Sequence, residues 1–433
     1  MNKHKIIISA VIVFLIAAVF SFLFYVRSFL YPTKAPLLTE SQQKELDEIQ
    51  SSYTYPVLNY CGYEKDYSDS LNLNCKSCII LDYETGTVVY EKNADTAIPP
   101  ASLTKLVNMY VLFEEIQAGH FSFNDIVPLP EESWYINAPP GSSLMLLEEG
   151  QKVTLKDLML GMAVMSGNDA AVASAIYTAG SLSAFVKRMN DVVSYLDCNN
   201  THFVDTSGYS ELNTTTARDF ARFSQIYLKH FPESIKLFHS VKEMTFNGIT
   251  HSSTNKVLGK VEGVDGLKTG YIEESGYNLA LTACKNDKRI IAILMGGSGT
   301  NSFEGNINRI HDSKEITDWY YSTFTTSLPD YYSFDVSAFC GSKNKLTLLP
   351  LYVTPFTVPL EKEKSIRLET EYKKIIDAPV KCGQSLGYLS FYCDEKLLGK
   401  VPLIADRTIE KGNFIKRQLD RAARKICRII QAR

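Results

Sequence analysis

Residues 99–117 read PPASLTKLVNMYVLFEEIQ and carry the strongest structural signal in the sequence. After the two prolines, the segment from Ser102 to Gln117 has apolar side chains on nearly every face of a helix. A helix on the surface of a domain has one apolar stripe, whereas a helix that is apolar all round is buried. We therefore predict a helix that runs through the middle of a domain.

The segments around this helix predict a sheet built from two distant parts of the chain. Residues 78–83 and 87–91 are β-branched and aromatic, and they flank a turn at 84–86, which predicts a hairpin. Later strands are expected at 267–268, 278–284 and 289–295, and helices at 155–165, 170–178, 182–196, 216–229 and 302–323. This order predicts an α/β fold in which an antiparallel sheet from both chain ends encloses helices from the middle.

The N-terminal segment predicts a membrane anchor. Residues 6–26 carry no charge and are long enough to cross a hydrocarbon core of about 30 Å. A cleaved signal peptide has a shorter apolar region and a small-x-small cleavage site, so an uncleaved anchor is favoured. Lys3 and Lys5 precede the span, which predicts that the rest of the chain lies outside the cytoplasm.

Composition divides the rest of the chain into four parts. The 433 residues carry 45 Lys or Arg and 48 Asp or Glu, and 45% of them are hydrophobic, so a disordered protein and a general nucleic-acid binder are disfavoured. The predicted organisation is an anchor or signal peptide at 1–30, a stalk at 31–75, a main domain at 76–325, a small all-β domain at 345–410 and a basic amphipathic helix at 411–433.

The C-terminal segment predicts a helix on a membrane surface. Residues 411–433 carry eight Lys or Arg and one Asp. Apolar residues recur at helical spacing between the basic ones, which is typical of a helix that lies on lipid. These residues are Ile415, Leu419, Ala422, Ile426 and Ile429.

The cysteines predict neither a disulfide scaffold nor a metal site. There are nine of them, so at least one is unpaired within the chain. Cys75 and Cys78 have redox or zinc-knuckle spacing, but no second pair lies near them at metal-site spacing. Two thiols or a local disulfide is the favoured interpretation, and we expect no metal and no cofactor.

Three short motifs carry the chemical signal. His-Glu-x-x-His, Gly-x-Ser-x-Gly and a Walker-type loop are absent, which disfavours zinc peptidases, α/β-hydrolases and P-loop enzymes. In chain order, the motifs are Ser102-Leu103-Thr104-Lys105 at a helix start, Ser166-Gly167-Asn168 at a helix junction, and Lys268-Thr269-Gly270 on a strand. Each motif alone has a simpler interpretation as a helix cap, a loop or a surface turn, but their order and structural context favour an active site.

The first motif predicts a nucleophile with its base. Ser102 and Lys105 are three residues apart, so they share one helix face and the amine can reach the hydroxyl. Lys105 must be mostly neutral to accept a proton, which requires burial and a second cation nearby, for which Lys268 is the candidate.

The other motifs predict the groups that hold the substrate. Ser166 and Asn168 supply a hydroxyl and an amide, suited to relaying a proton to a leaving amine and to holding a substrate amide. Lys268 and Thr269 suit a substrate carboxylate, and Gly270 lets a substrate lie along the strand edge. The backbone N–H groups of Ser102 and Tyr271 are the candidate donors to a developing oxyanion.

Together these motifs resemble the serine-type D-alanyl-D-alanine carboxypeptidases, which are low-molecular-mass penicillin-binding proteins. The resemblance covers residues 76–325, and residues 378–405 resemble the β-rich C-terminal domain of the same family. The segments that carry it are 100–105, 141–145, 166–171, 200–204, 216–219 and 264–271. It implies a penicillin-binding transpeptidase/β-lactamase-like fold, with an antiparallel sheet and helices on both faces.

The resemblance implies removal of the terminal D-Ala from peptidoglycan stem peptides through an acyl-serine, with β-lactam antibiotics as inhibitors. It implies Ser102 as nucleophile, Lys105 as proton acceptor, Ser166 as the second-motif serine and Lys268 as carboxylate contact. Thr254 stands where many members have Arg, and Tyr271 where many have His. The alternatives are a β-lactamase of the same fold and a catalytically silent peptidoglycan-binding protein. The expected location is the cell membrane, with membrane lipid as a partner, no nucleic acid, and the catalytic domain outside the cytoplasm.

Overall fold

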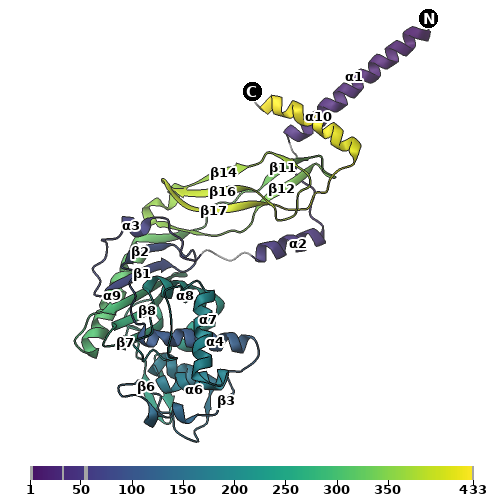
Figure 1. Ribbon diagram of the computed structural model, residues 1–433. Coiled ribbons are helices and arrows are strands. Elements are labelled where there is room, and N and C mark those ends of the chain that lie inside the picture. Colours follow the sequence, from purple (N-terminus) through teal and green to yellow (C-terminus); the bar gives the residue numbers. More distant parts are fainter. Residues whose placement is uncertain (1–2, 32–33, 53–56, 432–433) are drawn as a thin grey trace. The chain divides into compact units, whose positions relative to one another are not determined.

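The structure is a computed structural model that describes residues 3–31, 34–52 and 57–431. The chain divides into two compact units (Figure 1). The larger unit comprises residues 56–326 and 357–360, and the smaller unit comprises residues 1–55, 327–356 and 361–433.

The larger unit contains a five-stranded antiparallel sheet with the strand order β2-β1-β9-β8-β7. Its strands come from both ends of the unit, which confirms the predicted arrangement. They are β1 (Ser77–Asp82), β2 (Val88–Lys92), β7 (Val264–Ile272), β8 (Gly276–Lys285) and β9 (Lys288–Gly297). Because β7 is an edge strand, half of its backbone N–H and C=O groups face away from the sheet.

Helices cover both faces of this sheet. Ile79 and Leu81 of β1 belong to the core cluster that also contains residues of α4 and α6–α8. Successive side chains of a strand point to opposite faces, and the next residue, Asp82, accepts a 2.6 Å hydrogen bond from Tyr320 of α9. The α9 helix therefore covers the other face. The helices are α4 (Thr104–Gln117), α5 (Leu155–Leu160), α6 (Asn168–Ala179), α7 (Leu182–Tyr195), α8 (Ala217–His230) and α9 (Ser302–Thr323).

The central helix and the start of the helix predicted over 155–165 are both confirmed. Every residue of α4 from Thr104 to Phe113 is buried, as its apolar faces predicted. Thr154 and Asp157 form a capping box at the start of α5. The predicted helix over 155–165 changes its winding at Gly161, where a π-helical segment, η4 (Gly161–Met165), continues to the second motif.

Short elements complete the larger unit. They are α3 (Tyr63–Asp66), η1 (Ala101–Leu103), η2 (Glu131–Ser133), η3 (Tyr135–Asn137), η5 (Ile235–His239), and the paired strands β3 (Ile126–Val127) with β4 (Val153–Thr154), β5 (Glu243–Phe246) with β6 (Ile249–Ser252), and β10 (Phe324–Ser327) with β13 (Phe356–Pro359).

The smaller unit is built on a six-stranded sheet with the order β14-β16-β17-β12-β11-β15. It starts earlier than the predicted residue 345, because β11 (Phe334–Phe339) pairs with β12 (Lys345–Pro350) and β15 (Ile375–Asp377). The other strands are β14 (Ile366–Tyr372), β16 (Ser385–Cys393) and β17 (Lys396–Ala405), preceded by η6 (Leu360–Ser365) and followed by α10 (Phe414–Gln431).

The segment 31–75 differs from the predicted stalk. Residues 40–51 form a helix, α2 (Glu40–Ser51), whose Leu46 is buried. Arg407 of the smaller unit donates a 2.7 Å hydrogen bond to the Pro36 carbonyl. In the larger unit, the backbone N–H of Asn59 donates a 2.7 Å hydrogen bond to the Gly86 carbonyl. The described parts of this segment therefore pack against the two units, residues 34–52 against the smaller one and residues 57–75 against the larger one.

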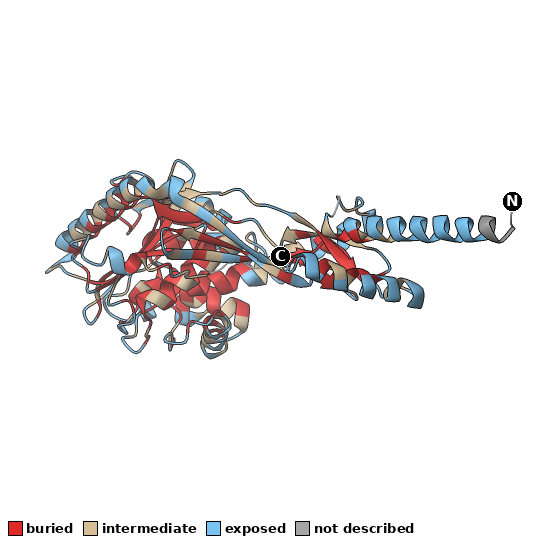
Figure 2. Ribbon diagram, turned by 90° about the horizontal axis from the view of Figure 1, so that it is seen from above, coloured by how far each residue is buried: buried red, intermediate tan, exposed pale blue. Residues whose placement is uncertain are grey.

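The N-terminal helix α1 (Lys3–Leu30) has two parts. Residues Ile7–Leu30 form a segment long and apolar enough to cross a membrane, with a mean hydropathy of 3.0. Most of α1 is exposed (Figure 2), but Val26 and Phe29 near its end are buried in a small cluster with Ala423 and Cys427 of α10. The end of the apolar helix thus belongs to the smaller unit.

Candidate active site

Ser102 and Lys105 lie at the start of the central helix and contact one another. Ser102 is in η1, a single turn before α4. Lys105 Nζ donates a 2.9 Å hydrogen bond to Ser102 Oγ. The spacing of three residues has therefore produced the contact that the sequence predicted.

Lys105 is held by two further acceptors from distant parts of the chain. Its Nζ donates to Asn168 Oδ1 at 2.7 Å and to the Ser207 carbonyl at 2.6 Å. Its side chain is fully buried, and burial lowers the pKa of Lys105 to about 7, although the charges of Asp205 and Asp169 oppose this shift. Near neutral pH a substantial fraction of Lys105 is therefore an uncharged amine that can accept a proton.

Burial is the largest cause of the low pKa of Lys105. Lys268 is itself 1% exposed, and its pKa is lowered by burial first and then by the charges of Lys105 and Arg309. The repulsion between two cations is mutual, so Lys268 is a cation near Lys105 of the kind that the sequence predicts.

The second motif forms the wall opposite the nucleophile. Ser166 follows the π-helical segment η4 in a left-handed conformation with φ +63°, and it is buried. Asn168 begins α6, and its side chain both accepts from Lys105 and lines the cleft described below. The turn therefore presents Asn168 to the cleft, and Ser166 is a buried residue of the same turn.

The third motif lies on the edge strand β7. Lys268 Nζ donates a 2.9 Å hydrogen bond to the Thr269 carbonyl, and Thr269 Oγ1 donates to Thr254 Oγ1 at 3.4 Å. A Cβ atom on Gly270 would lie 3.0 Å from the Ser102 backbone nitrogen. Only glycine permits this close approach of β7 to the nucleophile turn, and Tyr271 follows it at the cleft surface.

These elements surround a cleft of about 650 Å³. Ser102 of the first motif, Asn168 of the second motif and Tyr271, which follows the third motif, line it together. The remaining lining residues are Pro140, Gly141, Ser143, Gly208, Tyr209, Ser210, Glu211, Leu212, Ile272, Glu273 and Glu274. The cleft thus combines the Ser102 hydroxyl, the Asn168 amide and the open edge of a strand, which suits an extended peptide.

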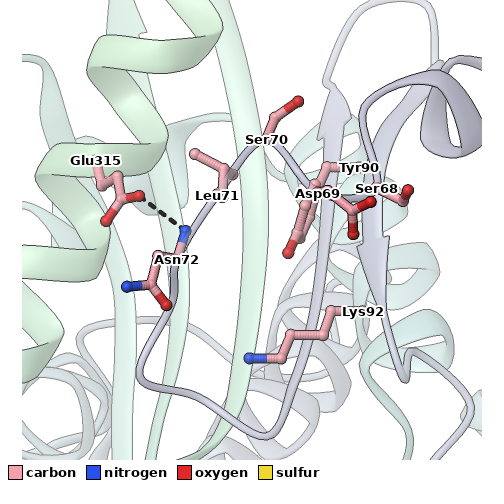
Figure 3. A pocket seen from close by; sticks show the side chains of 8 residues that line it. All are labelled: Ser68, Asp69, Ser70, Leu71, Asn72, Tyr90, Lys92 and Glu315. Carbon is pink, nitrogen blue, oxygen red and sulfur yellow. Dashed lines mark hydrogen bonds between the residues drawn. The ribbon is translucent and has the colours of Figure 1, made fainter.

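A second pocket of the larger unit lacks this arrangement. It holds Lys92 beside Tyr90 and the loop 68–72 (Figure 3). Lys92 Nζ donates to the carbonyls of Leu73 and Cys75 at 3.1 and 2.8 Å. Lys92 of strand β2 therefore holds the segment at 73–75 through backbone hydrogen bonds and, unlike Lys105, does not contact a serine hydroxyl.

The sequence patterns did not indicate three residues of the site, which are Asp205, Ser207 and Gly208. Asp205 accepts backbone hydrogen bonds from Ser207, Gly208 and Ser210 at 2.6–2.7 Å, and this shapes the loop that offers the Ser207 carbonyl to Lys105. Gly208 has φ +83° and lies against Ala101. The Asp-Thr-Ser-Gly sequence at 205–208 signals a turn, but its contact with Lys105 is formed only in the tertiary structure.

The cysteines have no visible role at this site. The buried pair Cys75 and Cys78 is not joined by a disulfide bond. Among the residues that the structure describes, no group of three or more His, Cys, Asp or Glu is arranged to hold a metal ion. The groups that the cleft offers are hydroxyls, amides, the amine of Lys105 beside Ser102 and the carboxyl groups of Glu211, Glu273 and Glu274.

Comparison with known families supports this chemistry. Residues 64–299 match the family described as D-alanyl-D-alanine carboxypeptidase, and residues 330–411 match the C-terminal domain of penicillin-binding protein 5. The chain is 33% identical to the D-alanyl-D-alanine carboxypeptidase DacA of Escherichia coli K12, with 80% of this chain and 87% of that protein aligned. It is 31% identical to DacF of Bacillus subtilis, with 78% and 87% aligned.

Two solved structures extend the comparison to the fold. Penicillin-binding protein 5 from Haemophilus influenzae has a TM-score of 0.72 and 28% identity, and the match covers 79% of this chain and 99% of that one. Penicillin-binding protein 6B from Escherichia coli has a TM-score of 0.65 and 28% identity, covering 81% and 99%. Both domains of the predicted fold are therefore confirmed.

Proposed function

The chain belongs to the D-alanyl-D-alanine carboxypeptidase family and is a serine-type, penicillin-binding hydrolase, and on this premise we propose which of its residues perform the reaction. Ser102 is the nucleophile and Lys105 is its base. The observation that carries this assignment is the 2.9 Å hydrogen bond between a fully buried lysine with a pKa of about 7 and the only hydroxyl of the first motif that lines the cleft.

In the first step, Ser102 Oγ attacks the carbonyl carbon of the penultimate D-Ala while Lys105 takes the hydroxyl proton. The N–H groups of Ser102 and Tyr271 stabilise the resulting oxyanion, because both lie where β7 approaches the nucleophile turn. The C–N bond then breaks, and the leaving amine receives a proton through Ser166. The product of this step is an acyl-serine and free D-Ala, and water completes the cycle by attacking the ester.

The substrate binds as an added strand along β7. Its terminal carboxylate meets Lys268 and Thr269, and its amide meets Asn168. The hydroxyl of Thr254 lies beside Thr269, so this chain offers a hydroxyl pair where many family members have an arginine. Peptidoglycan stem peptides are the substrates, and β-lactams acylate Ser102 as their mimics.

A fluorescent penicillin and a D-Ala-D-Ala pentapeptide test the assignment together. The wild-type protein should retain the label and release D-alanine from the peptide. Ser102→Ala should do neither, whereas Ser183→Ala on the exposed start of α7 should behave as the wild type. Labelling that survives in Ser102→Ala contradicts the assignment, and rapid loss of label from the wild type would instead favour a β-lactamase.

We further propose that both chain ends hold the protein at the outer surface of the cell membrane, with the catalytic unit outside the cytoplasm. The N-terminal span remains attached because its last residues belong to the core of the smaller unit. Phe29 is 5% exposed, its ring stacks on Phe339 at 4.1 Å, and its carbonyl accepts from Ser337 Oγ at 3.0 Å. Proteolytic removal of residues 1–30 would take these contacts away.

The structure of α10 supports its role as a surface helix. One side packs against the end of α1, where buried Asp420 accepts hydrogen bonds from Tyr25 Oη and from the Cys340 backbone at 2.6 Å. Ile426 of the predicted apolar stripe packs against the cluster with α1, whereas other members of the stripe are exposed, with 72% exposure at Ile415 and 62% at Ile429. An exposed apolar stripe between basic residues is suited to the lipid interface.

A further inference from the structure

Arg309 of α9 is a buried cation without an acidic partner. It is 8% exposed, and burial lowers its pKa to about 10. Within the residues that the structure describes, no carboxylate forms an ion pair with it. Its hydrogen-bond and ring partners are neutral groups, and the nearby charge that it interacts with is the cation of Lys268. Burying an uncompensated charge is costly, so an arrangement of this kind calls for a function.

The guanidinium is aimed at the backbone of the third motif. Nη2 donates a hydrogen bond to the Gly270 carbonyl, and Nη1 donates to Asn306 Oδ1 at 3.2 Å. The guanidinium carbon lies 5.1 Å from the centre of the Tyr277 ring, which fixes its plane from one side. Arg309 therefore reaches β7 from the helix layer and not from the cleft, so its contact with the substrate is indirect.

The Gly270 carbonyl and the Tyr271 N–H belong to the same peptide group. In a trans peptide, the C=O and N–H bonds point in opposite directions, so a cation on the oxygen leaves the N–H free on the other side. The two bonds are coupled by resonance, and a hydrogen bond to the oxygen strengthens the N–H as a donor. A full positive charge gives the largest effect of this kind.

We propose that Arg309 is a positioning residue of the oxyanion site: it polarises the Gly270–Tyr271 peptide and so strengthens the Tyr271 N–H that binds the developing oxyanion. This role rests on the proposed function, in which Ser102 and Tyr271 supply the two donors. It also explains why a buried arginine needs no carboxylate, because a nearby anion would cancel the polarisation. The partner of the guanidinium charge is the oxyanion itself, which exists only during the reaction.

The carbonyl stretch of the acyl-enzyme measures this effect directly. The full-length protein in detergent is acylated with a penicillin whose β-lactam carbonyl carries ¹³C, and isotope-edited infrared difference spectra report the ester carbonyl held by the two N–H donors. Arg309→Met should shift this band to higher frequency, because the donor is weaker. Its acylation rate constant should fall about tenfold, less than the 10²–10³-fold cost of losing a whole donor, with little change in KM.

Controls separate this role from a merely structural one. Asn308→Ala, on the neighbouring position of α9, should leave both the band and the rate unchanged. A folded Arg309→Met protein with the wild-type band overturns the proposal, even if its thermal stability is lower. If Arg309→Met does not fold, Arg309→Gln decides by the same band. Absence of acylation at Ser102 in the wild type would instead contradict the proposed catalytic residues.

Discussion

A Cβ atom on Gly208 would lie 1.8 Å from the carbonyl oxygen of Ala101 and 2.9 Å from Thr104 Oγ1. The loop at 205–208 is thus packed directly on the turn that carries the nucleophile. The same contact brings the Ser207 carbonyl within 2.6 Å of Lys105 Nζ. The position of Lys105, the proposed base, therefore depends on a loop about one hundred residues away in the sequence.

Gly208→Ala should abolish acylation. The added methyl group forces the loop away from Ala101, and the Ser207 carbonyl then no longer holds Lys105. Gly180→Ala is the matched control, because Gly180 has a similar φ of +76° but open space around its Cβ position. Both variants bear the left-handed cost of about 1–2 kcal/mol. The rate of penicillin acylation and the thermal midpoint should fall together in Gly208→Ala, and equal acylation in both variants would show that the close contact is unimportant.

The acylation rate should depend on the protonation of Lys105. Its pKa is about 7, so the rate should rise by about tenfold per pH unit below that value and level off above it. Lys105→Arg stays protonated at all accessible pH values and should be inactive across the whole profile. Stopped-flow absorbance with a chromogenic cephalosporin measures both proteins, and a wild-type rate independent of pH between 5 and 9 would contradict Lys105 as the base.

The lowered pKa of Lys105 also makes the stability of the folded protein depend on pH. The pKa of Lys105 is lower in the folded protein than its unfolded value of about 10.4, so between about 7 and about 10.4 the unfolded chain binds more protons. Stability from this group should therefore increase as the pH rises through that window. Denaturant titrations of Lys105→Met should show a smaller increase than the wild type, and an identical pH dependence would argue against the low pKa.

The sequence predicted those parts of the site that local spacing determines. Ser102 and Lys105 meet because they are three residues apart on one helix, and the strand position of Gly270 follows from its flanking residues. Asp205 and Arg309 were missed because their roles come from contacts between distant segments, Asp205 with the loop beside α4 and Arg309 with β7. A lone arginine on a polar helix gives no sign in the sequence that it will be buried.

The same reasoning explains the error at residues 31–75. The helix α2 has no apolar stripe and buries Leu46 alone, so its sequence resembles a linker. Its stability comes from tertiary contacts such as the 3.0 Å hydrogen bond from Gln50 to the Pro350 carbonyl. The spacing of apolar residues along the chain predicts helices and strands that bury an apolar face. It does not predict helices that are stabilised by single polar contacts, such as α2.

Lys268 should distinguish substrates by their terminal charge. Lys268→Ala should raise KM for a peptide that ends in a free carboxylate far more than for the same peptide as its carboxamide, because the ammonium is the carboxylate contact. Lys105→Ala should instead reduce kcat for both peptides by about 10² or more. Steady-state release of D-alanine and of D-alanine amide measures the two losses. An equal rise in KM for both peptides in Lys268→Ala would show that this lysine does not bind the terminal carboxylate.

The helices α1 and α10 should attach the protein to the membrane with unequal strength. Residues 1–24 can be exchanged for a cleavable export signal while Tyr25–Leu30, which pack against α10, are kept. High salt should release the resulting protein from membranes. A basic surface helix gains about 1 kcal/mol of binding free energy per basic residue, and salt screens this attraction, whereas a membrane-spanning helix is held effectively irreversibly.

The exposed apolar stripe of α10 can be tested in the same protein. Leu419→Ser removes an exposed apolar contact and should lower the bound fraction on anionic vesicles, whereas Gln418→Ser should not. Salt-resistant binding after the exchange would show that α1 is not the stronger attachment, and equal binding of the two serine variants would show that the exposed stripe of α10 does not enter lipid.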